Sequence, residues 1–343
     1  MKQAFVIHNC PGTLAAGHST YCPTALQRMF DGKKLNHMLD FSNDVSNRDL
    51  IVQNVGRISI SGAQEKLSAI IVEGKICLAP EGMQSRYIIK PAPDDKRLNH
   101  RKQLPANEHL TMQIARQVYG IKTAENALIF FQNGDMAFIT KRFDVKPDNT
   151  KTKQEDFASL LQKTNETHGK YFKYTGNYAD MGVVFQRFVA AWKVEITKFF
   201  RLIVFNYLFS NGDAHLKNFS LQQSENGDYL LSPAYDLLNT SLHIQDEDFA
   251  LEGGLFRKEF QSEIYRQKGH PCREDFIDFA QMIGVPDHQI NKIMNVFLTA
   301  HPLIYDLTKR SFLNEKLKRM YIRSYEERLQ RLNRHSTNPS NNS

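Results

Sequence analysis

The pattern of apolar and polar positions changes near the middle of the chain. From residue 51 to residue 144, short apolar runs alternate with turn residues, which is typical of antiparallel strands. The segment 66–80 has Glu73-Gly74 between two runs of β-favouring residues and therefore predicts a hairpin. Further strands are predicted at 85–93, 123–131 and 135–144.

One helix interrupts these strands. In the segment 105–120, Leu110, Ile114 and Val118 fall at helical spacing, a proline stands at the start and Gly120 stands at the end. The first part of the chain therefore predicts a mainly antiparallel sheet that carries one helix.

The remainder of the chain has mostly helical spacing. Residues 180–192 and 195–209 are helical by period and length, and most of 273–334 has the same character. The exception is 219–231, where two short apolar runs flank a polar turn and predict a hairpin. We therefore expect an α+β fold with two lobes and a cleft between them. The expected boundaries are 1–142 for a β-rich N-lobe, 143–334 for a helical C-lobe and 335–343 for a polar, disordered tail.

Composition is that of a globular protein, with 41% hydrophobic and 24% charged residues. The formal net charge of +7 favours acidic partners such as nucleotides, but no zinc-finger, RNP or basic-helix signature indicates direct nucleic-acid binding. The four cysteines have no zinc spacing, which indicates thiols in a reducing compartment. Because no signal-peptide core and no membrane-spanning run is present, the sequence predicts a soluble cytoplasmic protein with no membrane partner.

A cluster of polar residues, "NGDAHLKNFS" at 211–220, directly follows the apolar run at 198–209. Asp213 and Asn218 stand in the D-x-x-x-x-N spacing of the kinase catalytic loop. In such a loop the aspartate meets the acceptor hydroxyl as a base, and the asparagine holds a magnesium ion on the phosphates. The alternative is an ordinary capped helix end and turn with solvated side chains.

A second carboxylate follows the predicted hairpin, at Asp236 in "SPAYDLLN". It stands where a kinase has its other metal-holding aspartate, and carboxylate and amide oxygens suit Mg²⁺. The order of helix, D-x-x-x-x-N, short hairpin and aromatic-Asp reproduces the layout of a kinase core, which favours the catalytic interpretation.

Lys90 and Glu108 supply further kinase features in the first part of the chain. Lys90 ends a predicted strand, from which a lysine can reach the phosphates of ATP, and Glu108 near the start of the following helix can pair with it. The alternatives are a solvated lysine at a strand edge and a carboxylate that only stabilises the helix N-terminus.

Two more segments are candidates for nucleotide contacts. The segment 56–66 contains Ser59, Ser61 and Gly62, whose small side chains allow backbone N–H groups to approach phosphate oxygens. Lys141 and Phe143 lie on the strand that would link the lobes, where their backbone could face the adenine edge. A polar turn and a plain strand end are the respective alternatives.

Six segments of the chain together carry a resemblance to a known family. In order they are "SISGAQEK", "YIIKPAP", "NEHLTMQIA", "FITKRFD", "NGDAHLKNFS" and "SPAYD". Over about residues 20 to 330, the chain resembles the HipA family of bacterial toxin serine/threonine kinases. The resemblance implies a two-lobed, kinase-like fold that uses ATP and Mg²⁺ to phosphorylate serine. It also implies a toxin–antitoxin operon with a HipB-type DNA-binding antitoxin, so that contact with DNA is indirect.

Carried over residue by residue, the resemblance implies that Asp213 is the catalytic base and that Asn218 and Asp236 hold magnesium. It also implies that Lys90 contacts phosphates and that His215 lies beside the active-site loop. Lys141 departs from the family, because HipA has an acidic residue in that place, which puts that side-chain contact with the nucleotide in doubt.

The chain is shorter than HipA before the phosphate loop, and in this respect it is similar to the HipT kinases of HipBST systems. In those systems the missing piece is a separate small protein, so a HipS-like partner is expected. HipA-type kinases autophosphorylate in the phosphate loop, which implies modification of Ser59, Ser61 or both, and inhibition of the enzyme by the added charge. The implied substrate class is an aminoacyl-tRNA synthetase, phosphorylated on serine so that translation and growth stop.

Two other functions remain open. The same base and metal residues serve any alcohol acceptor, as in a small-molecule or lipid phosphotransferase. A protein that binds ATP and only docks a DNA-binding antitoxin is a further alternative, although such a protein would not need Lys90, Asp213, Asn218 and Asp236 together.

Overall fold

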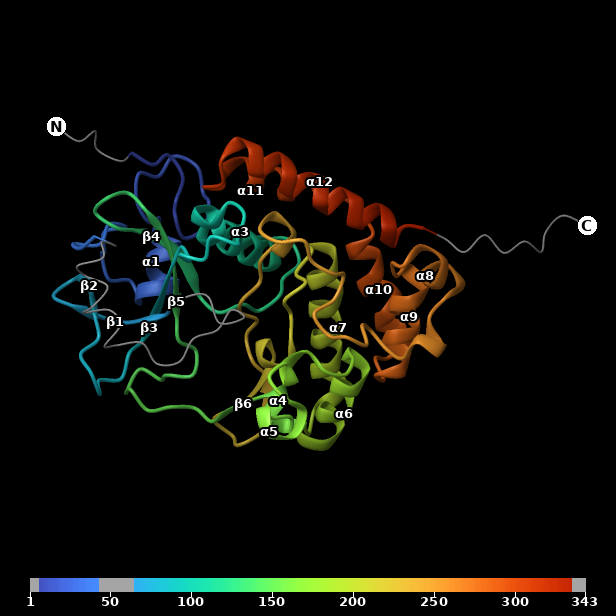
Figure 1. Cartoon of the computed structure of the whole chain (residues 1–343). Helices are drawn as coiled ribbons and strands as arrows, with labels where there is room; N and C mark the ends of the chain where they lie inside the picture. The colour runs from blue at the N-terminus through green and yellow to red at the C-terminus, as the bar shows by residue number, and fades with distance from the viewer. Residues whose placement is uncertain (1–5, 43–64, 335–343) are drawn as a thin grey trace, which may run out of the picture. The chain divides into compact units, whose positions relative to one another are not determined.

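The computed structural model of this chain describes residues 6–42 and 65–334 (Figure 1). The chain forms two compact units. The first comprises Met1–Lys151, Leu242–Ile244 and Pro302–Tyr321, and the second comprises Thr152–Ser241, Gln245–His301 and Ile322–Ser343. Ser59, Ser61, Gly62 and the tail at 335–343 lie outside the described residues, so what the sequence implies for them stays a prediction.

A five-stranded antiparallel sheet forms the centre of the first unit, in the order β2-β1-β3-β5-β4. It confirms the predicted hairpin and the three further predicted strands. Glu73 and Gly74 have φ angles of 48° and 76°, as a two-residue hairpin turn requires. The strands are Leu67–Val72 (β1), Lys75–Leu78 (β2), Tyr87–Pro91 (β3), Asn126–Phe130 (β4) and Met136–Lys141 (β5).

One face of this sheet packs on helix α1 (Pro23–Phe30), which the pattern analysis did not single out. Tyr87 and Ile89 of β3 belong to the same buried cluster as Phe30. Burying such a side chain stabilises the fold by about 1.5–3 kcal/mol. Because successive residues of a strand point to opposite faces, Lys90 points away from this cluster.

The predicted helix of the first unit is confirmed as α3 (Leu104–Gln117), which packs on β4 and β5. All of its residues from Leu104 to Ala115 are buried. Helix α11 (Pro302–Arg310) packs on α3 (Figure 1). A distant segment near the C-terminal end therefore completes the first unit.

The second unit is built around α7 (Trp192–Leu208), which is buried over most of its length. A helix that is apolar on several sides must be covered on several sides, and α6 (Tyr178–Phe188) and α10 (Asp287–Phe297) both pack against it. The remaining helices confirm the predicted helical character of the C-terminal region. They are α4 (Phe157–Leu160), α5 (Asn165–His168), α8 (Glu263–Lys268), α9 (Arg273–Met282) and α12 (Glu315–Leu332), of which α12 belongs to this unit only from Ile322.

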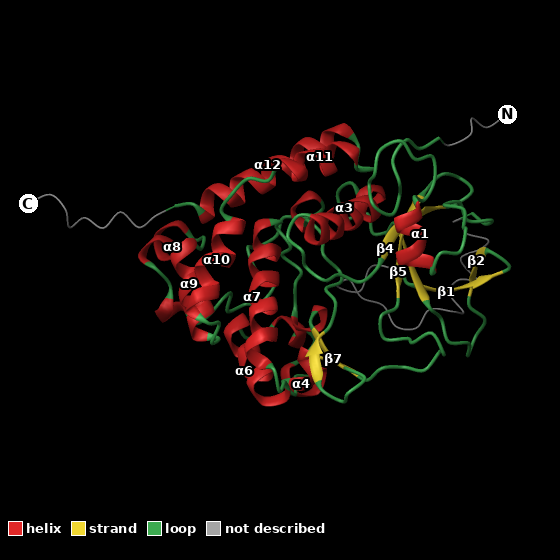
Figure 2. Ribbon diagram, turned by 180° about the vertical axis from the view of Figure 1, so that it is seen from behind, coloured by secondary structure: helices red, strands yellow, loops and turns green. Residues whose placement is uncertain are grey.

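A three-stranded antiparallel sheet lies beside α4 in the same unit (Figure 2). Strands β7 (Ser220–Gln223) and β8 (Tyr229–Leu231) confirm the predicted hairpin. Strand β6 (Gln154–Asp156) adds a third strand, which the apolar pattern did not reveal because its three residues are polar.

The four cysteines all lie within the described residues and are free thiols. Among the helices that the structure describes, none has the length and apolar character needed to cross a membrane.

Candidate active site

The D-x-x-x-x-N segment begins where α7 ends, and hydrogen bonds hold its backbone in place. Ser210 has a φ of 52°, which turns the chain out of the helix. The Gly212 N–H donates to Thr240 Oγ1 at 2.9 Å, and the Thr240 hydroxyl donates to the Ser210 carbonyl at 2.9 Å. The segment does end a helix and Lys217 is exposed, but Ser210, Asn211 and His215 are buried, so the alternative of solvated side chains describes Lys217 and not His215.

Asp213 accepts a hydrogen bond from the hydroxyl of Tyr174, with 2.9 Å between the phenolic oxygen and Oδ1. Burial raises the pKa of the Asp213 carboxyl to about 6, and the carboxylates of Asp246 and Asp236 add to this rise. The Tyr174 hydrogen bond and the Lys173 ammonium act in the opposite direction. A carboxylate whose pKa is raised in this way is a stronger base than one in water.

His215 is buried beside this carboxylate, with 3% of its surface exposed. Its Nε2 lies 2.9 Å from Lys173 Nζ, and its ring meets the Tyr174 ring edge-on at 5.2 Å between centroids. Burial lowers the pKa of His215 to about 3, with a further contribution from the Lys173 charge. The imidazole is therefore neutral near pH 7.

Asn218 and Asp236 lie in contact, with 3.2 Å between Asn218 Nδ2 and Asp236 Oδ2. Asn218 Oδ1 accepts from the His215 N–H at 3.1 Å, and Asp236 has a left-handed φ of 56°. These two side chains offer the hard oxygen ligands that Mg²⁺ prefers, so the donor set fits the expected ion. In the described part of the chain no group of three or more His, Cys, Asp or Glu gathers as a metal site. An ion here would therefore take its other ligands from phosphate and water.

Gly212 is required at its position because Asp246 packs directly against it. A Cβ at residue 212 would lie 2.4 Å from Asp246 Oδ2 and 2.8 Å from the Glu247 carbonyl oxygen. The segment that carries Asp246 is held in place through Asp248, which forms ion pairs with Arg328 and, at 3.4 Å, with Arg331, and whose Oδ2 lies 2.8 Å from His270 Nδ1.

In the first unit, Lys90 and Glu108 form the ion pair that the sequence predicts, with 2.6 Å between Nζ and Oε1. Both side chains are buried, so the solvated strand-edge lysine does not describe Lys90, and Glu108 pairs with a cation instead of only stabilising the helix N-terminus. Lys90 Nζ also lies 5.3 Å from the centre of the Phe138 ring. The role of the pair toward phosphate stays a prediction.

Lys141 is held by groups of its own unit. Its ammonium lies 2.6 Å from Asp31 Oδ1, and its backbone N–H donates to the Glu125 carbonyl at 2.8 Å. This N–H is therefore not the backbone donor expected to face adenine. The Lys141 carbonyl and the Phe143 backbone stay candidates for that contact.

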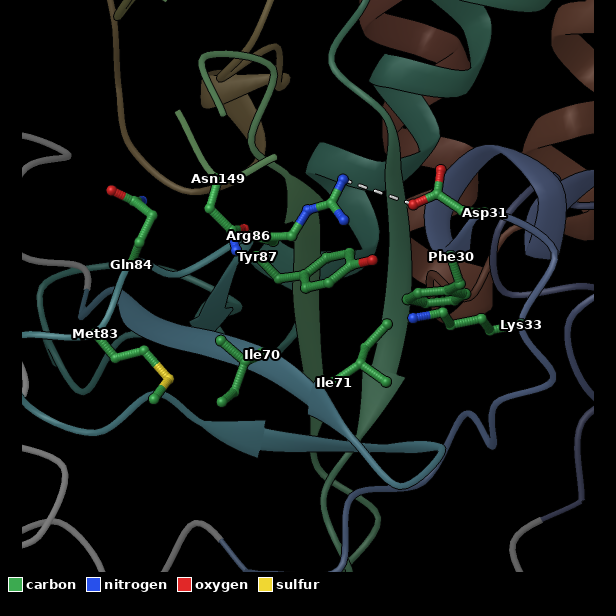
Figure 3. A pocket seen from close by; sticks show the side chains of 10 residues that line it. All are labelled: Phe30, Asp31, Lys33, Ile70, Ile71, Met83, Gln84, Arg86, Tyr87 and Asn149. Carbon is green, nitrogen blue, oxygen red and sulfur yellow. Dashed lines mark ion pairs between the residues drawn. The ribbon is translucent and has the colours of Figure 1, made fainter. Parts of the chain in front are cut away.

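A cavity of about 440 Å³ lies next to Asp31 in the first unit (Figure 3). Tyr87 lines it, and since Tyr87 and Lys90 point to opposite faces of β3, this cavity is distinct from the surroundings of Lys90. No motif in the sequence indicated it. The side chains that Figure 3 shows around it are Phe30, Asp31, Lys33, Ile70, Ile71, Met83, Gln84, Arg86, Tyr87 and Asn149.

Comparison with known families gives a match over most of the chain. The model of the HipA-like C-terminal domain matches residues 58–302. The chain belongs to this family. This finding confirms the resemblance to HipA, while the relation to the HipT branch stays a prediction.

The HipA-like chain also has relatives described as putative kinases. One from Haemophilus influenzae is 26% identical over 332 residues, which cover 92% of this chain and 93% of that protein. Another, Y4dM of Sinorhizobium fredii, is 33% identical over 211 residues, which cover 57% of this chain and 48% of that protein.

Comparison with solved structures shows a similar fold over most of the chain. HipA of Shewanella oneidensis, solved with HipB and its operator DNA, matches with a TM-score of 0.59 at 18% identity, over 84% of this chain and 70% of that one. The Helicobacter pylori kinase CtkA matches with a TM-score of 0.50 at 16% identity, over 78% of this chain and 90% of that one. The fold is therefore kinase-like.

In this HipA-like chain the second unit gathers four of the predicted residues around one loop, namely Asp213, His215, Asn218 and Asp236. Sequence reasoning missed the side chains that surround them, above all Lys173, Tyr174, Asp246 and Thr240. The one available signal was the repeated Lys-Tyr dipeptide of "KYFKY" at 170–174, which carries no known chemistry by itself.

Proposed function

We propose that this HipA-like chain is a protein serine/threonine kinase that uses Mg-ATP and acts in the cytoplasm as the toxin of a toxin–antitoxin system. The observation that carries the proposal is the arrangement of one loop. It presents a partly buried carboxylate, Asp213, and five residues later Asn218, which contacts the second carboxylate, Asp236. A base and a pair of metal ligands in this order are what phosphoryl transfer to a hydroxyl requires.

In the proposed reaction, the oxygen of a substrate serine attacks the γ-phosphorus of ATP. The serine proton passes to Asp213, the bond to the β,γ-bridging oxygen breaks, and ADP leaves. Burial suits Asp213 to this task because it raises the pKa of the carboxyl toward the working pH. His215 packs beside the loop, and because burial lowers its pKa to about 3, it is too weak a base to compete with Asp213 for the proton.

Asn218 and Asp236 would hold Mg²⁺, which when bound neutralises charge on the ATP phosphates. Lys90, fixed by Glu108, is proposed to contact the phosphates. The Phe143 backbone is proposed to contact the adenine edge, and the loop with Ser59, Ser61 and Gly62 is proposed to cover the phosphates. Phosphorylation of Ser59 or Ser61 would place negative charge beside those phosphates and inhibit the enzyme.

For partners, we propose a HipB-type DNA-binding antitoxin and, if the chain follows the HipT branch, a HipS-like small protein. The complex of Shewanella HipA with HipB and operator DNA supports a HipB-type partner. The proposed substrate is a serine of an aminoacyl-tRNA synthetase, whose phosphorylation would stop translation.

Incubation of the purified chain with Mg-ATP, followed by peptide mass spectrometry, tests this function. We expect rapid phosphorylation of Ser59 or Ser61 in the wild type and only a slow residual phosphorylation in the Asp213→Asn variant. Phosphate that stays on other sites in a Ser59→Ala, Ser61→Ala chain would contradict the assignment of those serines.

The two alternatives give different results in the same experiment. ATP that binds without any phosphoryl transfer would favour a docking module for the antitoxin. Transfer to a small alcohol or a lipid, with an unmodified chain and unmodified synthetases, would favour a small-molecule phosphotransferase.

A further inference from the structure

The segment "KYFKY" at 170–174 contains the same Lys-Tyr dipeptide twice. In each copy the lysine ammonium lies over the following tyrosine ring, at 5.7 Å for Lys170 and Tyr171 and 4.9 Å for Lys173 and Tyr174. Their surroundings differ. Tyr171 is 63% exposed, whereas Tyr174 is partly buried against the D-x-x-x-x-N loop.

Tyr174 is held at its backbone, at its ring and at its hydroxyl. Its carbonyl accepts from the Glu252 N–H at 3.0 Å, and its ring meets the His215 ring edge-on at 5.2 Å. Its hydroxyl donates to Asp213 Oδ1 at 2.9 Å. A hydrogen bond to one carboxylate oxygen from so well-fixed a donor restricts rotation of the carboxylate about its Cβ–Cγ bond.

Lys173 fixes the neighbouring imidazole. Its Nζ lies 2.9 Å from His215 Nε2. An ammonium group only donates hydrogen bonds, so Nε2 must be the acceptor, which makes His215 a neutral ring protonated on Nδ1. Lys173 therefore sets both the tautomer and the position of His215, three residues before Asn218.

We propose that Lys173 and Tyr174 are positioning residues of the phosphoryl-transfer site, in which Tyr174 orients the Asp213 carboxylate and Lys173 orients His215. The inference rests on the proposed function, because it concerns the base of the same reaction. It adds to the D-x-x-x-x-N loop a second chain segment, 39 residues earlier, that sets the direction in which the base faces the attacking hydroxyl.

A base that can rotate spends less time aligned with the attacking hydroxyl, and small misplacements of reacting groups are costly in rate. We expect Tyr174→Phe to lower the single-turnover rate of phosphoryl transfer by about 10- to 100-fold. Since Tyr174 is not proposed to bind ATP, the apparent KM for ATP should stay within about two-fold of wild type.

The first Lys-Tyr copy provides the matched controls. Tyr171→Phe and Lys170→Met remove the same groups three residues earlier and should leave the rate unchanged. Lys173→Met should lower the rate, and Lys173→Arg, which keeps a cationic donor, should restore part of it. Thermal midpoints measured alongside should show that all of these variants fold.

The decisive experiment measures transfer of ³²P from γ-labelled ATP to the chain itself, with Mg²⁺, for Tyr174→Phe, Asp213→Asn and the double variant. We expect Tyr174→Phe to cost nothing further once Asp213 is changed, because Tyr174 acts through that carboxylate. A merely structural role would lower the residual rate equally in both backgrounds and would overturn the inference.

An active wild type with an equally active Tyr174→Phe chain would also overturn the inference and leave the proposed kinase function intact. A wild type as inactive as Asp213→Asn would instead overturn the proposed function and this inference with it.

Discussion

Lys90 and Glu108 form an ion pair within the first unit, with 2.6 Å between Nζ and Oε1 and both side chains buried. Removing two ions from water costs several kcal/mol each, and their attraction at close range roughly offsets that cost. A well-packed apolar pair would therefore stabilise the fold about as well. The retention of two charges here is consistent with a role in binding phosphate.

Removal of one charge should therefore be worse for stability than removal of both. Lys90→Met leaves the Glu108 carboxylate buried without its cation, and we expect a loss of about 3–5 kcal/mol in the free energy of unfolding. The double variant Lys90→Met, Glu108→Leu should recover most of the lost stability but should still be inactive in phosphoryl transfer. Urea denaturation measures the first effect and ³²P transfer the second.

A surface pair provides the control for this comparison. Lys75 and Asp40 lie 2.7 Å apart with both side chains mostly exposed, so Lys75→Met should leave the unfolding free energy unchanged. Equal losses for the single and double variants at Lys90 and Glu108 would contradict the account of the buried pair.

Gly212 gives a second prediction at the scale of residues. A methyl group there would lie 2.4 Å from the Asp246 carboxylate, so Gly212→Ala must displace either that segment or the catalytic loop. We expect a loss of about 1–3 kcal/mol in stability and a fall of about 100-fold in transfer rate. Circular dichroism melts and ³²P transfer measure these effects.

Gly227→Ala is the control for Gly212→Ala. Gly227 lies in the β7–β8 turn with a φ of 90° and no neighbouring atom nearer than 4.0 Å to a new Cβ. This change should strain the turn and leave the rate intact. If Gly212→Ala were as active as Gly227→Ala, the close contact with Asp246 would have no bearing on the site.

At the scale of elements, α3 is a helix whose polar residues are buried together with its apolar ones. Thr111 Oγ1 lies 2.9 Å from Tyr321 Oη, and Asn107 Nδ2 lies 2.9 Å from His243 Nε2, so distant segments satisfy these polar groups. Buried polar groups cost stability unless they are bonded in this way. The helix that carries Glu108 is therefore held by specific bonds as well as by apolar packing.

His109 in α3 should make stability depend on pH. Burial lowers its pKa from 6.5 to about 4, so between these values the unfolded chain takes up a proton that the folded chain does not. Above pH 6.5, His109 therefore does not reduce the free energy of unfolding. Below pH 6.5, the free energy of unfolding falls by about 1.4 kcal/mol per pH unit as the pH decreases toward 4.

Urea denaturation from pH 7.5 to 4.5 measures this slope. In His109→Gln the slope below pH 6.5 should be smaller than in wild type by about that amount. If the free energy of unfolding fell equally with decreasing pH in the two proteins, His109 would not remain neutral in the folded state.

At the scale of the whole molecule, the C-terminal region contributes to both units. Residues Pro302–Tyr321 belong to the first unit and the chain from Ile322 belongs to the second. Within the second unit, Arg328 of α12 pairs with Asp248 and donates to Ser210 Oγ at 3.2 Å, and its guanidinium lies 4.8 Å from the Tyr207 ring centre. One arginine thus fastens the end of α7, from which the catalytic loop leaves.

Arg328→Met should accordingly reduce both stability and activity. It leaves Asp248 with weaker partners in a partly buried position, and we expect a loss of about 3 kcal/mol together with slower phosphoryl transfer. Arg323→Met, in the same helix but in an exposed pair with Glu327, should cost less than about 1 kcal/mol. Thermal unfolding of both variants makes the comparison, and equal midpoints would contradict it.

The sequence by itself determined most of the secondary structure of the described chain, though not α1 or β6, and most of its reactive residues. Alternating apolar runs and the Glu73-Gly74 turn were enough to place β1 and β2, and helical spacing was enough to place α3 and α7, because these patterns follow from local backbone geometry. The D-x-x-x-x-N spacing likewise located Asp213 and Asn218, since both lie in one continuous loop.

Only the tertiary structure decided what surrounds those residues. Tyr174 reaches Asp213 from 39 positions away, Asp246 covers Gly212 from a segment after the hairpin, and the polar strand β6 pairs with β7. None of these contacts leaves a periodic signal, because each depends on how separate elements pack and on which polar groups become buried. The burial of the Lys90–Glu108 pair and the burial that raises the pKa of Asp213 are properties of the folded chain alone.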